Sequence, residues 1–162
     1  MINFSKKFKS APMNLQERYQ EDFILLASLR QFVEQGTMLA SVNFWRDSAQ
    51  NFKELTAIEE RSTIIDSHPN FKENEFLVSF ISTEFPHIED HIPDNIYELV
   101  FPLIEATEGK DTLDLLKDFL IAYAVYISKS STEDWKSFIG LSDSIRDAEE
   151  TFILKLKELI NY

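Results

Sequence analysis

Apolar residues recur every three or four positions along most of this chain, which is the spacing of helices that bury one face. Alternating runs of Val, Ile and Thr, the pattern of β-strands, are few. Glycine occurs three times and proline five times, so few residues interrupt a helix. We therefore predict an all-α protein of about seven helices, at residues 14–35, 37–47, 56–68, 71–85, 94–107, 111–127 and 146–161.

The predicted helix boundaries depend on a few capping and breaking residues. Gly36 and Gly109 are expected to end the first and fifth helices. Pro102 is expected to kink the fifth helix, because proline lacks the N–H that an interior position donates. Thr56-x-x-Glu59 has the form of a capping box, in which two side chains satisfy each other's free amides. It predicts that the third helix starts there.

The sixth predicted helix carries the most apolar stripe in the chain. Side chains at this spacing lie along one face of a helix, so we expect this helix to be the most buried element. The stripe comprises Leu113, Leu116, Phe119, Leu120, Tyr123 and Ile127. No linker rich in Pro, Gly or Ser divides the chain. We predict a basic N-terminal tail at residues 1–13 and a single all-helical domain at residues 14–162.

Two segments of the chain resemble each other. Leu55 and Ile145 each lie four positions ahead of a Glu-Glu pair, which begins at Glu59 in one segment and at Glu149 in the other. Each segment also follows an apolar, alanine-containing run and a polar loop. This repetition favours a duplication that gave two related helical halves packed as one domain. It predicts that the two segments are equivalent helix starts.

The chain is acidic. It has 28 Asp and Glu residues against 16 Lys and Arg, and a formal net charge of −12. This charge argues against nucleic acid as a partner, because contacts from Lys and Arg to phosphates dominate that affinity. Such a charge is typical of a helical protein whose molecules stay soluble because their like-charged surfaces repel one another. It also suits a cationic partner, and protein partners are the class that we expect.

The first nine residues differ from the rest, since they hold three lysines and no acid. Phe4 and Phe8 lie four apart among these lysines, which suits a short helix on an anionic membrane surface. A frayed terminus is the simpler interpretation. The longest apolar run, at residues 119–127, is well short of the roughly 20 residues that cross a bilayer. The chain has no cysteine, which excludes disulfides and thiolate zinc sites and fits a reducing, cytoplasmic location.

No catalytic motif stands out, and we predict that the protein is not an enzyme. The chain has no glycine-rich phosphate loop, no Gly-x-Ser-x-Gly and no pair of Glu-x-x-His motifs of the kind that di-iron bundles carry. His87 and His91 have the four-residue spacing of zinc proteases, but they lie between two prolines, which predicts a surface loop. His68 is expected to cap the carbonyls at a helix end.

Several features of the two halves occur in a fixed order. The second half has Ala122 and Ala124 in a helix, then Trp135-x-x-Phe138-Ile139-Gly140, then the second Glu-Glu segment. The first half has LTAIEERSTIIDSHPNFKENEFLVSFI at residues 55–81. With these features the chain resembles the bacterial tellurite-resistance TerB-like family over about residues 23–160.

The resemblance implies an all-helical domain of two repeats in which acidic loops from both halves approach each other. It also implies an association with tellurite and stress resistance, a non-catalytic binding or scaffolding role, and divalent-cation binding. The family's loops commonly carry an Asp-Gly dipeptide ahead of the helix-start glutamate. This chain has no Asp-Gly dipeptide.

The candidate metal ligands are acids of the two loops and helix starts. Asp47 would act beside Glu59 in the first half, and Asp143 and Asp147 beside Glu149 in the second. Carboxylate oxygens suit Ca²⁺, Mg²⁺ or Mn²⁺. Alternatively, the two glutamates only stabilise helix N-termini through the helix dipole. Further acids of the same loops are also candidates, namely Glu54 and Asp134.

A second function fits the same sequence. An acidic immunity protein or antitoxin blocks a basic partner by charge complementarity. Such a protein needs no metal ion. The two hypotheses therefore differ in whether the protein takes up divalent cations.

Overall fold

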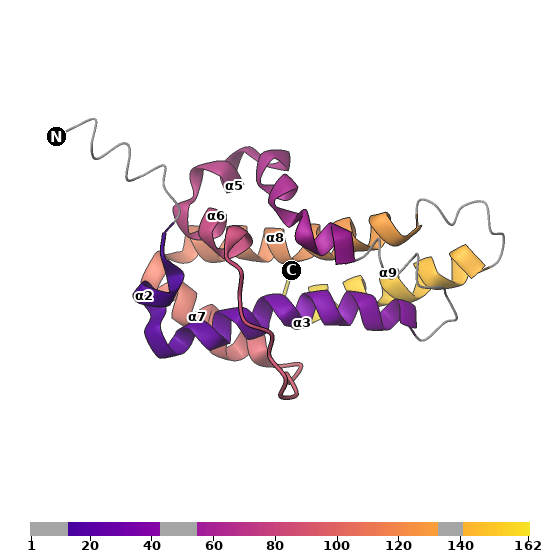
Figure 1. Cartoon of the computed structure of the whole chain (residues 1–162), viewed down its shortest axis with the longest axis horizontal. Helices are drawn as coiled ribbons and strands as arrows, with labels where there is room; N and C mark the ends of the chain where they lie inside the picture. Colours follow the sequence, from indigo (N-terminus) through magenta and orange to yellow (C-terminus); the bar gives the residue numbers. More distant parts are fainter. Residues whose placement is uncertain (1–12, 43–54, 133–140) are drawn as a thin grey trace.

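The computed structural model of the chain (Figure 1) describes residues 13–42, 55–132 and 141–162, with side chains at 13–37, 55–128 and 150–162. Within these ranges every regular element is a helix and no strand occurs. The predicted all-α class is therefore confirmed. No helix in the same ranges is long and apolar enough to cross a membrane.

The N-terminal part of the described chain is a bent helical segment. It consists of α2 (Leu15–Tyr19), the 3-10 turn η1 (Gln20–Asp22) and the long helix α3 (Phe23–Val42). The side chain of Asn14 caps α2 by accepting a hydrogen bond from the backbone N–H of Glu17 at 3.1 Å. The apolar face of this segment is buried, as the predicted helical stripe requires.

Short helices occupy the middle of the chain. Residues 55–59 are helical and lead into η2 (Arg61–Ser67), α5 (Pro69–Glu73) and α6 (Glu75–Ser82). These three elements contact one another and α8. In Figure 1 they lie on the side of α8 that faces away from α3. An irregular loop at residues 83–95 follows α6 and crosses α3.

Three longer helices complete the described chain, α7 (Ile96–Glu108), α8 (Lys110–Thr132) and α9 (Leu141–Leu159). Helices α3 and α8 run side by side, and each contacts both α7 and α9. The predicted central helix is α8. Every residue of its predicted apolar stripe is buried, and α8 packs against long and short helices alike. The predicted burial of this stripe is confirmed.

Gly109 ends α7 as predicted. Its φ angle of 95° lies in the left-handed region that glycine adopts without steric cost. Its backbone N–H donates to the carbonyl of Glu105 at 3.1 Å. Because α8 begins at the next residue, Asp111 lies in its first turn rather than before it. A carboxylate in the first turn still favours the helix through the dipole.

Gly36 does not end a helix, so that prediction is wrong. Helix α3 continues through Gly36 to Val42, and the predicted helices at 14–35 and 37–47 are joined there. The physical reason is packing. A Cβ atom on Gly36 would lie 2.2 Å from ring atoms of Phe152 on α9, so glycine lets the two helices approach closely.

The predicted helix at 71–85 is divided at Asn74. This residue ends α5, and its side chain accepts a hydrogen bond from the backbone N–H of Leu77 at 2.9 Å, which starts α6. His68 also caps a helix start rather than an end. Its Nδ1 accepts from the backbone N–H of Asn70 at 3.2 Å. Pro69 then takes the first helical position, where no N–H is needed.

The two Glu-Glu segments are not equivalent helix starts, contrary to the prediction. Helix α9 begins at Leu141, so Ile145 and Glu149 are interior positions. In the other segment the chain is already helical at Leu55, and the 3-10 helix η2 follows Glu60. Thr56 is therefore inside a helix and is not its cap. Glutamate is a good helix former at any exposed position, so a Glu-Glu pair alone does not mark a start.

The central position of α8 yields the first testable prediction. Leu116 is fully buried, so Leu116→Ala should lower the free energy of unfolding by about 2–5 kcal/mol through lost burial and a residual cavity. Leu99 on α7 is 56% exposed, and Leu99→Ala is the matched control, expected to change stability by about 0.5 kcal/mol or less. Urea unfolding measures both. Similar losses in the two variants would contradict the docking of α8.

Candidate functional site

A groove opens between the second half of α3, the loop at 83–95 and α9. Its volume is about 630 Å³, within the range of roughly 300–1,000 Å³ that is common for ligand sites. Four apolar side chains form its floor, Phe32, Ile88, Ile92 and Phe152. Polar and charged side chains form its rim, Gln35, His87, Glu89, Asp90, His91, Asp94, Thr151 and Lys155. The groove therefore combines an apolar base with an ionic edge.

The close approach of α3 and α9 builds the floor of the groove. The rings of Phe32 and Phe152 lie 6.3 Å apart between centroids, at an interplanar angle of 56°. This spacing is typical of tilted aromatic pairs. Gly36 lies one turn after Phe32 and lines the same groove. Its missing side chain leaves the space that the Phe152 ring occupies.

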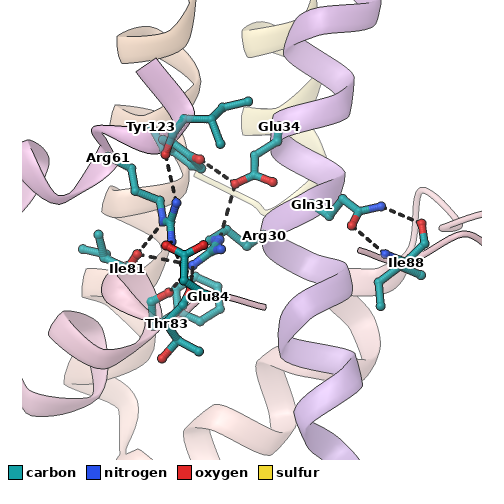
Figure 2. A network of polar contacts seen from close by, with 11 residues as sticks. Arg30, Gln31, Glu34, Arg61, Ile81, Thr83, Glu84, Ile88 and Tyr123 are labelled. Carbon is teal, nitrogen blue, oxygen red and sulfur yellow. Dashed lines mark hydrogen bonds and ion pairs between the residues drawn. The ribbon is translucent and has the colours of Figure 1, made fainter. Parts of the chain in front are cut away.

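The loop wall is attached to α3 by one buried glutamine. The Nε2 of Gln31 donates to the carbonyl of Ile88 at 2.8 Å, and its Oε1 accepts from the N–H of Ile88 at 2.8 Å (Figure 2). This pair satisfies both groups of the Ile88 backbone and both polar ends of the amide. A net hydrogen bond contributes about 1 kcal/mol. The contact holds Ile88 at the floor of the groove.

Two buried arginines fix the point where the loop leaves α6. Arg30 of α3 donates to the carbonyls of Phe80 at 2.9 Å and Thr83 at 2.7 Å. Arg61 of η2 donates to the carbonyls of Ile81 at 2.6 Å and Thr83 at 3.0 Å. These carbonyls belong to the end of α6, where no intrahelical N–H reaches them. Cations are also favourable at this end of the helix dipole.

The partly buried Glu34, the exposed Glu84 and the buried Tyr123 complete this network (Figure 2). Glu34 lies 3.4 Å from Nε of Arg30 and accepts the O–H of Tyr123 at 2.5 Å. Glu84 lies 3.1 Å from Nη2 of Arg61. Burial raises the pKa of Tyr123 and lowers that of Arg30. None of these side chains lines the groove, so the network contributes to the groove only by positioning the loop.

The structure leaves the predicted metal site as a prediction. Asp47 lies outside the described residues. Helix α9 includes Asp143, Asp147 and Glu149, but their side chains are outside the described part of the structure. Glu59 is exposed. Among the described side chains, no group of three or more His, Asp or Glu residues is arranged to hold a metal ion.

The histidine pair lies in a surface loop, as the flanking prolines predicted. His87 and His91 are exposed, and both line the groove. Sequence reasoning did not identify this groove. A signal was present, because Ile88 and Ile92 are apolar residues in an otherwise polar segment and both face the protein. Apolar residues in a loop between two prolines indicate that the loop packs against a helix.

Comparisons of the chain with protein-family models, with curated proteins and with solved structures found no match. The groove has an apolar base and one wall whose backbone is fixed by two hydrogen bonds. An apolar floor gives affinity, and polar groups at the edge give orientation.

The contact between Gly36 and Phe152 yields the second prediction. In the wild type, Gly36→Ala should be neutral or destabilising, because its Cβ would meet the Phe152 ring at 2.2 Å. In a Phe152→Leu background the same change should stabilise α3 by up to about 1 kcal/mol through helix propensity. The expected coupling in urea unfolding is about 0.5–3 kcal/mol. An equal effect of Gly36→Ala in both backgrounds would contradict the close approach of α3 and α9.

Proposed function

We propose that this protein is a non-catalytic binding or scaffolding module, and that the groove between α3, α9 and the loop at 83–95 receives a segment of a protein partner. The observation that carries the proposal is an apolar floor with a fixed wall. Gln31 holds the loop backbone at Ile88 through two hydrogen bonds of 2.8 Å. A wall that is already in place lowers the entropy cost of binding.

The cellular role that we propose is in tellurite and stress resistance. The resemblance to TerB-like proteins over about residues 23–160 supports this role, and so does the all-helical fold. A domain of two related halves, with a cytoplasmic location, is part of the same proposal. The role includes no catalytic step.

Peptide-display selection on the full-length protein tests the proposed binding site. Gln35 is exposed and lines the groove, so Gln35→Trp should obstruct it without removing core contacts. Gln16→Trp on α2, also exposed, is the matched control. We expect selected peptides to bind the wild type and the control alike, and Gln35→Trp at least about tenfold more weakly, which corresponds to 1.4 kcal/mol.

Two outcomes would overturn the binding site. The selection could enrich no peptide, or the enriched peptides could bind all three proteins equally. Because the library is unbiased, neither outcome depends on the charge of the partner.

A second cellular role, that of an acidic immunity or antitoxin-type protein, is favoured by one observation. Three acids line the groove, Glu89, Asp90 and Asp94, against one lysine, Lys155. This excess would attract a basic partner in the same groove. The two roles share the binding site and differ in metal uptake.

Calorimetric titration with Ca²⁺, Mg²⁺ and Mn²⁺ separates the two roles. The TerB-like role predicts specific uptake, with added stability of about 2.7 kcal/mol at a hundredfold excess over Kd. Glu59→Gln combined with Glu149→Gln should abolish this gain. The adjacent pair Glu60→Gln with Glu150→Gln is the matched control. No uptake in the wild type, or equal uptake in both double variants, would contradict the metal site and favour the immunity-type role.

A further inference from the structure

The rim of the groove carries negative charge that the described residues do not fully neutralise. Asp94 is paired with Lys155, whose Nζ lies 3.3 Å from Oδ2. Glu89 and Asp90 are exposed and form no hydrogen bond or ion pair with the side chains and backbone that the structure describes. Two carboxylates therefore stand free at the edge of an apolar floor.

The floor beneath these carboxylates is largely aromatic. Phe32 and Phe152 are only partly buried, and both line the groove. An aromatic face accepts an apolar side chain, and it also attracts the cationic head of Lys or Arg. The aliphatic stems of Lys and Arg cover apolar surface while their heads remain near carboxylates. The chemistry of the floor and that of the rim thus select the same kind of ligand.

Resting on the proposed function, we propose that the occupant of the groove is a cationic amphipathic segment of a partner protein. One large apolar side chain of this segment packs on Phe32 and Phe152. Lysines or arginines on either side of it in the segment face Glu89 and Asp90. A small polyamine would meet the same carboxylates, but it has no apolar group to cover the floor. The chain's net charge of −12 steers a cationic segment toward the protein.

Two synthetic hexapeptides probe this chemistry on the full-length protein. One has a central Leu-Phe flanked by two lysines on each side, and its twin has glutamates in place of the lysines. A third peptide keeps the lysines but replaces Leu-Phe by Ala-Ala, and spermine serves as the small cation. NMR titration locates each probe through the amide shifts of Phe32, Ile88 and Phe152, and calorimetry measures its affinity.

Charge variants then separate the rim from the general charge of the protein. Glu89→Gln with Asp90→Asn neutralises the rim. Glu73→Gln with Asp114→Asn makes the same change in net charge at exposed acids of α5 and α8, which do not line the groove. We expect the rim variant to weaken the lysine peptide with Leu-Phe by roughly fivefold to tenfold, and the control by less than about twofold. Raising the salt concentration should reduce the difference.

Each outcome of these titrations either supports or overturns the inference. Groove shifts with the lysine peptide, and their loss in the rim variant, support the inference. Equal binding of the glutamate twin, of the Ala-Ala peptide or of spermine would overturn it, as would equal losses in the two charge variants. If the unbiased selection yields peptides that depend on Gln35 but carry no positive charge, the inference fails while the proposed binding module stands.

Discussion

The burial of two arginines against the end of α6 is the interaction on which the rest of the structure depends. Arg30 and Arg61 are 5% and 4% exposed, and removing such charges from water costs several kcal/mol each. Backbone carbonyl oxygens offset most of this cost, since they accept from both guanidinium groups, and the partly buried Glu34 adds an ion pair to Arg30. Since the two residues come from α3 and η2, their shared acceptor at Thr83 ties three segments to one point. An alternative packing would leave a buried cation without acceptors.

The groove follows from this constraint. With the end of α6 fixed, the loop at 83–95 leaves toward α3, and Gln31, the residue after Arg30, holds it again at Ile88, five residues after Thr83. The cation–π contact of Arg30 with Phe85, at 4.5 Å, anchors the residue between these two points. On the exposed side of the loop, Glu89 and Asp90 form no hydrogen bond or ion pair with the residues that the structure describes. A rigid wall with a free ionic edge results.

Whether the sequence predicts a feature of this structure depends on how far apart in the chain the interacting residues lie. The all-α class and the buried stripe of α8 follow from local periodicity, and both were predicted. Gly36 was interpreted as a helix end, because a glycine that admits a ring from α9 looks like an ordinary breaker without its partner. Asn74 was placed inside one helix, because an apolar pattern continues past it and only its capping hydrogen bond shows the division. Arg30 lies on the predicted apolar stripe, four positions after Leu26 and three before Val33, so its burial could be predicted from spacing. The acceptors of Arg30 and Arg61 could not. Their acceptors lie about 50 and 20 positions away in the chain, and only the fold brings them together.

The buried network also determines where the negative charge of the protein is displayed. Arg30 with Glu34 and Arg61 with Glu84 form two ion pairs that cancel, so the net charge of −12 belongs to the remaining residues. A field of this kind attracts cations over the whole surface, and salt screens it beyond about 10 Å. The field therefore raises the rate at which a cationic partner meets the protein, but it favours no single position on the surface. In the described part of the chain, the groove places an apolar floor beside the exposed carboxylates of Glu89 and Asp90, so burial of apolar surface, and not charge alone, would select the position of a cationic partner there.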